Sequence, residues 1–175
     1  NNSIKVNRGA GLTFTKIQGE LEIYDRKLSV AEVQHRIDAY WQPYHTALNN
    51  EFDRLHSLFG QVWHINCHSM PAKGNEHSED GPVERADFVL GDRDGTTCAP
   101  EFTQFVADFL SGRGYDVAIN WPMKGVELVR KHGRPDENRH SLQIEVNRRL
   151  YMHETEITQN DLYPETALVL ADMNA

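Results

Sequence analysis

Two stretches of the sequence place polar side chains at alternate positions, so that a β-strand would present them on one face. The first is "VWHINCHSMP", residues 62–71, in which apolar residues and Cys67 alternate with the polar ones. Its polar positions are His64, Asn66 and His68. A buried polar side chain costs stability unless it is hydrogen-bonded or binds something. This face is therefore a candidate binding surface.

The second stretch is "SLQIEVNRRLYM", residues 141–152, in which Gln143, Glu145 and Asn147 alternate with aliphatic residues. A carboxylate in the middle of an apolar strand is uncommon, because an unpaired buried charge is expensive. One interpretation is an edge strand whose polar face is in water. The other is that Glu145 is a general base whose pKa is tuned by its site. The pattern is compatible with both.

His68 ends the first of these strands, and α/β proteins place ligands at the carboxyl ends of strands. A neutral imidazole at that position is a plausible zinc ligand. A second zinc-like spacing, His153-x-x-Glu156 in "HETE", follows the last strand in a polar segment, and we interpret it as a chance match. His45 is left open as a further candidate.

Several arginines could hold a carboxylate through two parallel hydrogen bonds. They are Arg8, Arg85, Arg93, Arg134, Arg139, Arg148 and Arg149. The better candidates are Arg93, inside the glycine-flanked "GDRDG", and Arg148, which closes the strand that carries Glu145.

The elements that must position these residues alternate between strands and helices. Ser29 and Glu32 form a capping-box pattern, and apolar residues then recur at steps of three and four as far as Gly60. Pro43 predicts a kink near Tyr40–Trp41. Further strands are expected at 61–68, 86–95, 115–122 and 141–152, with helices at 99–114 and 161–175. This alternation predicts an α/β sheet covered on both faces.

The composition excludes several classes of protein. A chain of 175 residues is enough for one ordinary domain. Its formal net charge of −8 argues against a broad phosphate-binding surface, so we expect no nucleic-acid partner. No apolar run approaches about 18 residues, so we expect no membrane partner. The oligomeric state is left open.

The two cysteines, Cys67 and Cys98, form neither a zinc-knuckle spacing nor a disulfide framework. We interpret them as free thiols in a reducing compartment. Because Cys67 faces away from His68 in strand phase, we expect it to pack in the core and to bind nothing.

Together these segments resemble the N-formylglutamate amidohydrolase (deformylase) family. The matching pieces are "YWQPYHTAL", "NCHSMP", "ADFVLGDRDGTTC", "GYDVAINWPMKG" and "HSLQIEVNRRLYM". They occur in the family's order. The resemblance implies a three-layer α/β sandwich with a mixed central sheet, related to zinc carboxypeptidases, and one zinc ion.

The resemblance also implies roles for particular residues. His68 of "CHSM" matches a zinc ligand at a strand end, and Glu145 of "LQIEV" matches the general base. His64 and Asn66 would either support the zinc ligand or form a polar layer of the sheet. Asn7 and Arg8 of "KVNR" resemble a pair that binds the substrate. The family's first two metal ligands have no match in this sequence. Either they lie outside this chain, or this version lacks a complete zinc site.

The expected function is zinc-dependent hydrolysis of N-formyl-L-glutamate to formate and glutamate. The chain, residues 1–175, would be a single cytoplasmic hydrolase domain that takes a small-molecule N-acyl amino acid and serves histidine degradation. One alternative is a hydrolase of another N-acyl or peptide amide. The other is a non-catalytic binding domain that keeps the fold but has an incomplete metal site.

Overall fold

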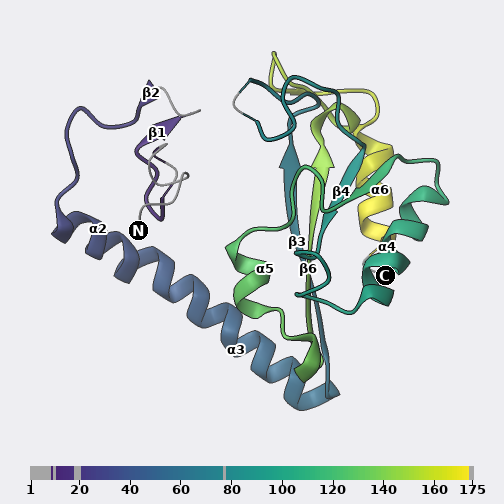
Figure 1. Ribbon diagram of the computed structural model, residues 1–175, viewed down its shortest axis with the longest axis horizontal. Coiled ribbons are helices and arrows are strands. Elements are labelled where there is room, and N and C mark those ends of the chain that lie inside the picture. The colour runs from purple at the N-terminus through teal and green to yellow at the C-terminus, as the bar shows by residue number, and fades with distance from the viewer. Residues whose placement is uncertain (1–8, 10, 18–20, 77, 174–175) are drawn as a thin grey trace. The chain divides into compact units, whose positions relative to one another are not determined.

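The computed structural model describes residues 9, 11–17, 21–76 and 78–173 (Figure 1). It divides the chain into two compact units, Asn1–Glu51 and Phe52–Ala175. Both polar strand segments singled out above lie in the second unit. The organisation as a single hydrolase domain stays a prediction. No helix in the described ranges is long and apolar enough to cross a bilayer.

The first unit contains a short hairpin and most of a long helical segment. The hairpin pairs β1 (Lys16–Ile17) antiparallel with β2 (Leu21–Glu22). The helical segment comprises α2 (Val30–Arg36), the π-helical turn η1 (Ile37–Trp41) and α3 (Gln42–Phe59), whose last turns, from Phe52 onward, belong to the second unit.

The expected boundaries of this helical segment are confirmed. Ser29 accepts the Glu32 N–H and the Glu32 carboxylate accepts the Ser29 N–H, which completes the capping box. The irregularity expected near Tyr40–Trp41 takes the form of the π-helical turn just before Pro43. Proline has no N–H to donate, so the regular helical ladder is interrupted there. Gly60 follows the last turn with a φ of 70° and donates to the His56 carbonyl at 2.8 Å.

The described part of the second unit is built on a four-stranded mixed sheet in the order β3-β6-β4-β5. The strands are β3 (Val62–Met70), β4 (Phe88–Gly91), β5 (Val117–Ile119) and β6 (Arg139–Asn147). β3 is parallel to β6, β4 is antiparallel to β6, and β5 is parallel to β4. The mixed central sheet expected from the sequence is confirmed.

Helices lie on both faces of this sheet (Figure 1). α4 (Pro100–Ser111) and α6 (Tyr163–Met173) cover one face, and α5 (Glu127–His132) lies on the other. The apolar core is on the α4 and α6 side. It is formed by buried residues of β4, β6, α4 and α6, including Phe88, Leu90, Val106, Leu110, Leu142, Ile144, Val146 and Val169. The remaining short elements are η2 (Pro135–Glu137), η3 (Arg148–Leu150), β7 (Met152–His153) and β8 (Thr158–Gln159).

The position of β6 decides between the two interpretations of Glu145. β6 lies between β3 and β4 rather than at an edge, and the Glu145 residue is only 6% exposed. The interpretation of a wet edge strand is therefore wrong. Glu145 is a buried carboxylate on the face that α5 covers.

β3 is less covered than the sequence suggested. It lies at the edge of the described sheet, and Cys67 is exposed. The expectation that Cys67 packs in the core is therefore wrong. The helices α4 and α6 pack on β4 and β6, and a cavity of about 300 Å³, lined by Cys67, Tyr163 and Leu170 among others, remains beside the end of β3. Cys98 is buried, and both thiols are free.

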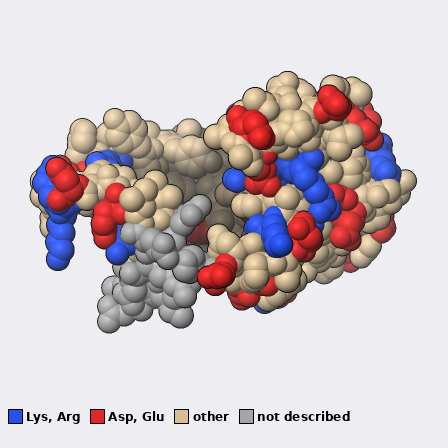
Figure 2. Space-filling model, turned by 90° about the horizontal axis from the view of Figure 1, so that it is seen from above, with Lys and Arg blue, Asp and Glu red and all other residues tan. Residues whose placement is uncertain are grey.

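On the face displayed in Figure 2, Lys and Arg side chains are interspersed with Asp and Glu rather than gathered into one basic surface. The expectation that nucleic acid is not the partner stays a prediction.

Candidate active site

His68 and Glu145, the predicted metal ligand and the predicted base, lie at the same place in the sheet. In the parallel pairing of β3 with β6, His68 is the direct register partner of Glu145. Their side chains therefore share a face, and the His68 Nδ1 lies 3.8 Å from the Glu145 Oε1. A register slip of one residue would place them on opposite faces. The strand register thus brings the predicted metal ligand beside the predicted base.

Burial sets the acid–base character of Glu145. Desolvation raises the pKa of this carboxyl group above its ordinary value, because burial penalises the charged form. The nearby His68, a hydrogen bond from Gln143 and the charges of Arg85 and Arg148 oppose that shift. The net direction is upward. A carboxylate with a raised pKa accepts a proton more readily, which is what a general base requires.

A hydrogen-bonded chain of amides connects the two residues through their neighbours. The Gln143 Nε2 donates to the Glu145 Oε1 at 2.7 Å, and the Gln143 Oε1 accepts the Val126 N–H at 2.8 Å. Asn66 Nδ2 lies 3.1 Å from the His68 Nε2 and 3.4 Å from the Gln143 Oε1. The alternating pattern had included Gln143 and Asn66, but it assigned no role to Gln143.

His64 belongs to the same face but to a more closed part of it. Its Nδ1 lies 2.8 Å from the Ser141 hydroxyl, and its ring is 5.2 Å from that of Phe52. Burial lowers the pKa of this imidazole, so the neutral form is favoured. His64 is therefore part of a hydrogen-bonded polar layer of the sheet.

Of the predicted substrate-binding residues, Arg148 lies closest in the chain to Glu145. It is the first residue of η3, immediately after β6, and its Nε donates to the Ser69 hydroxyl at 3.3 Å. Its guanidinium is 36% exposed and makes a long ion pair with Glu154, at 3.7 Å. Its positive charge partly opposes the upward shift in the pKa of Glu145.

Arg93 lies on a different loop and is engaged with the backbone. Its residue has a left-handed backbone, with a φ of 54°, and its Nη1 donates to the Gly125 carbonyl at 2.9 Å. Its N–H donates to the Lys124 carbonyl at 2.8 Å, so Arg93 fastens the turn before α5. Asn7 and Arg8 lie outside the described residues. The substrate-binding roles of all four remain predictions.

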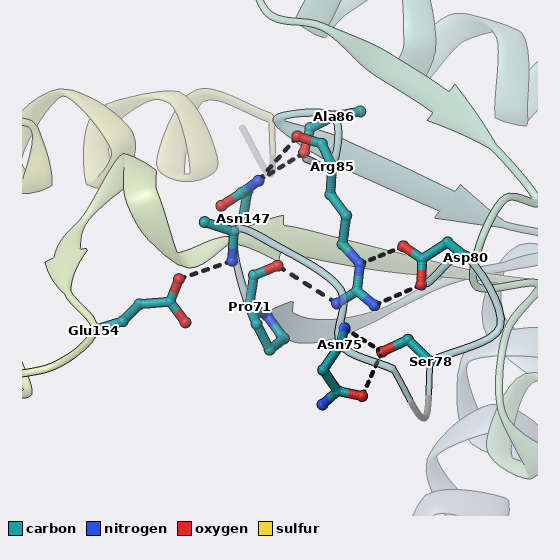
Figure 3. A network of polar contacts seen from close by, with 9 residues as sticks. Pro71, Asn75, Ser78, Asp80, Arg85, Ala86, Asn147 and Glu154 are labelled. Atoms are coloured by element: carbon teal, nitrogen blue, oxygen red, sulfur yellow. Dashed lines mark hydrogen bonds and ion pairs between the residues drawn. The ribbon is translucent and has the colours of Figure 1, made fainter. Parts of the chain in front are cut away.

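Arg85 is a cation near Glu145 that the sequence did not single out among the arginines. It is 8% exposed, and its Nε and Nη2 donate to the two carboxylate oxygens of Asp80 at 2.7 and 2.9 Å (Figure 3). This bidentate pair holds in place a positive charge that partly opposes the upward shift in the pKa of Glu145. The signal for this pair in the sequence is the spacing of Asp80 and Arg85 within a polar loop. Such a loop is usually solvated, so the spacing does not predict a buried ion pair.

The loop that carries Arg85 is tied to the end of β6. The Asn147 Nδ2 donates to the carbonyls of Arg85 and Ala86, at 3.2 and 2.9 Å (Figure 3). Glu154, from the "HETE" segment, accepts the Ala72 N–H at 2.7 Å. That segment therefore holds the loop in place through Glu154.

The residues present fit one position of a zinc site. The His68 side chain is 39% exposed, Asn66 contacts its Nε2, and its Nδ1 faces Glu145. Catalytic zinc sites use three protein ligands. Among the described residues, no three His, Cys, Asp or Glu side chains are grouped so as to hold a metal ion. The described residues therefore do not supply a complete set of three ligands, and His68 is the candidate for one of them.

Comparisons with known proteins agree with one another. The sequence model of the family described as N-formylglutamate amidohydrolase matches residues 2–152. The chain is 31% identical over 145 residues to the N-formylglutamate deformylase of Pseudomonas putida. The aligned region covers 81% of this chain and 53% of that protein. It is 30% identical over 127 residues to the deformylase of Pseudomonas aeruginosa, covering 72% and 47%. The chain spans about half the length of these curated relatives.

A solved structure shows the same fold. The crystal structure of N-formylglutamate amidohydrolase from Ralstonia eutropha JMP134 superposes with a TM-score of 0.88 at 45% sequence identity. The match covers 97% of this chain and 61% of that one.

Proposed function

The chain belongs to the N-formylglutamate amidohydrolase family, and on that premise we propose that it forms part of an enzyme that hydrolyses N-formyl-L-glutamate to formate and glutamate. The observation that carries this proposal is the register pairing of His68 with Glu145 on a buried face of the sheet. The relatives named as N-formylglutamate deformylases support the substrate.

In the proposed reaction Glu145 is the general base. It accepts a proton from water as the water oxygen bonds to the formyl carbon. It then gives that proton to the amine of glutamate as the carbon–nitrogen bond breaks, and formate is released. The raised pKa of Glu145 suits both transfers, since the group must hold the proton between them.

We propose that the enzyme uses zinc, with His68 as one ligand and two further ligands from outside the described residues. A bound zinc ion would lower the pKa of water toward ~7 and polarise the formyl carbonyl. The contribution of this chain is to hold His68 at the strand end, beside the proposed base. The relationship to zinc carboxypeptidases is part of the same proposal.

Arginines and an asparagine would bind the anionic substrate. Arg148 is partly exposed, beside the end of β6, and is proposed to hold a substrate carboxylate, together with Asn7, Arg8 and Arg93. Arg85 is committed to Asp80 and acts as a fixed charge. The cytoplasmic location and the role in histidine degradation remain proposals that rest on the family resemblance.

A second candidate function is binding without catalysis. It is favoured by the lack of a three-ligand metal cluster among the described residues. Hydrolysis of another N-acyl or peptide amide is a variant of the first proposal.

One experiment separates these functions. The protein that contains this chain is purified, its zinc content is measured, and turnover is followed with N-formyl-L-glutamate and a panel of N-acyl amino acids. Zinc near one ion per chain with preferential turnover of N-formyl-L-glutamate supports the first proposal. Binding of N-formyl-L-glutamate without turnover by the folded protein would favour the binding domain.

A further inference from the structure

We propose that Gln143 is a positioning residue that fixes the orientation of the Glu145 carboxylate and links it to the turn before α5. The inference rests on the proposed function, because it gives Glu145 the role of base. It concerns a residue that is almost completely buried: Gln143 is 1% exposed.

The orientation of the Gln143 amide follows from its partners. Its Oε1 is 2.8 Å from the Val126 backbone nitrogen, which can only donate. The carbonyl end of the amide must therefore point toward Val126, and the NH₂ end toward Glu145. At 2.7 Å from the Glu145 Oε1, that NH₂ group donates a short hydrogen bond to a carboxylate.

This bond restricts the carboxylate of Glu145. Oε1 is the oxygen that accepts from Gln143, and it is also the oxygen nearest the His68 Nδ1, at 3.8 Å. With Oε1 engaged, the plane of the carboxylate is set and Oε2 is the oxygen left to accept a proton from water. Catalysis by a general base depends on such geometry, because the base must lie within hydrogen-bond reach of the proton.

The other end of the amide holds a turn over the same face. Gly91 is the register partner of Gln143 in β4, and a Cβ atom at Gly91 would lie 2.6 Å from the Gly125 nitrogen. A side chain at position 91 would therefore clash with the backbone of the turn, and glycine allows the turn to approach β4 this closely. Arg93 holds the turn from the other side through the Gly125 carbonyl. Gln143 is thus the connection between the turn and the base.

The first test is kinetic. Gln143→Met keeps the length of the side chain and removes both the donor and the acceptor. We expect kcat to fall by up to ~10²-fold with KM nearly unchanged, since small displacements of a catalytic group have effects of this size. In the Glu145→Gln background the same substitution should cause no further fall, because its effect acts through Glu145.

Ser141→Ala is the matched control. Ser141 is fully buried on the same face of β6, two residues from Gln143, and its hydroxyl bonds to His64 rather than to Glu145. We expect this variant to keep the kcat of the wild type. An equal fall in both variants, or an additive fall in the Glu145→Gln background, would mean that Gln143 is merely structural.

The second test does not depend on turnover. Crystal structures of the wild type and of Gln143→Met should show the Glu145 carboxylate rotated away from His68 in the variant. An unchanged carboxylate would overturn the inference, whatever the activity. If the wild type turns over no N-formyl-L-glutamate, the proposed function fails and these structures still decide the role of Gln143. If Gln143→Met does not fold, Gln143→Asn, which keeps an amide that is too short to reach both partners, replaces it in both tests.

Discussion

Glu145 and His68 are paired residues of two parallel strands, with the carboxylate oxygen 3.8 Å from the imidazole nitrogen. The pairing is fixed along the whole of β3 and β6, from Val62 opposite Arg139 to Met70 opposite Asn147. The relation between the proposed base and the proposed metal ligand is therefore set by the sheet rather than by a loop, and it can be tested from either residue.

Replacing the base should separate chemistry from folding. Glu145→Gln keeps the shape of the side chain and an oxygen that can accept from Gln143, but it cannot take a proton from water. We expect turnover of N-formyl-L-glutamate to fall by about 10²–10⁴-fold, which is the usual contribution of a general base. Zinc content and the melting temperature should remain those of the wild type. Unchanged turnover would assign Glu145 to structure alone.

Replacing the proposed metal ligand should, unlike replacing Glu145, change the zinc content. His68→Ala is expected to abolish stoichiometric zinc in the protein that contains this chain, because His68 is the proposed ligand on this face. His64→Ala is a suitable control, since His64 is hydrogen-bonded to Ser141 deeper in the sheet. Metal analysis of both purified variants tests the assignment. Zinc retained in His68→Ala would remove this residue from the metal site.

Substrate recognition should depend on Arg148. A hydrogen bond to a charged group contributes about 1.5–3 kcal/mol, so Arg148→Ala should raise KM by roughly 10–100-fold if its guanidinium holds a substrate carboxylate. Arg149→Ala is the neighbouring control, because Arg149 is paired with Asp87 at 2.8 Å. Steady-state kinetics of the two variants give the comparison. Similar KM values in both would argue against Arg148 as a substrate contact.

The ion pair of Asp80 with Arg85 should stabilise the fold. Both side chains are nearly inaccessible, at 2% and 6% exposure, so Asp80→Asn leaves a buried cation without its counter-charge. Loss of one partner of a buried pair costs about 3–5 kcal/mol of unfolding free energy. Asp94→Asn removes an exposed pair with Lys124 and should cost at most about 1 kcal/mol. Urea unfolding measures both, and equal small losses would contradict the prediction.

The stabilisation that the ion pair of Asp80 with Arg85 provides should depend on pH in a definite direction. Arg85 holds the pKa of Asp80 below its ordinary value of 3.8. The stabilisation is therefore fully present above that value and is lost as the pH falls through the lower pKa of the folded state. The difference in stability between the wild type and Asp80→Asn should accordingly shrink only in acid. A difference that is already lost at neutral pH would contradict this origin.

Much of this site was predictable from alternation alone. The phase of residues 141–147 placed Gln143, Glu145 and Asn147 together, and the structure has them on one face of β6. The capping box at Ser29 and the end at Gly60 are local signals, and both are confirmed. Such features depend on a few neighbouring residues, which is why the sequence reveals them.

Other features depend on contacts between distant segments. Nothing local shows that β6 is interior while β3 is at an edge, so the burial of Glu145 and the exposure of Cys67 had to come from the structure. The role of Arg85 likewise depends on Asn147, more than sixty residues away, which holds its backbone. Pairing of strands and anchoring of loops are tertiary effects that override local pattern.

The two thiols should differ in reactivity, which tests the corrected position of Cys67. Burial raises the pKa of Cys98 to about 11, and Cys98 also contacts Thr103 at 3.2 Å inside the core. Cys67 is exposed beside the cavity at the end of β3, although partial burial raises its pKa above the ordinary value of 9.0. The thiolate is the reactive form, so alkylation should be slow at neutral pH and should accelerate as the pH rises.

We therefore expect iodoacetamide to label one thiol in the folded protein and two in urea. Because Cys67 is exposed and Cys98 is buried, the reagent should reach Cys67 alone in the folded protein. Cys67→Ser should therefore remove the label, and Cys98→Ser should leave it. Intact-mass spectrometry counts the labels. Labelling that persists in folded Cys67→Ser would show that Cys98 is the accessible thiol. If Cys67 is not labelled in the folded wild type even at high pH, its side chain is buried. That result would contradict the exposed position of Cys67 on β3.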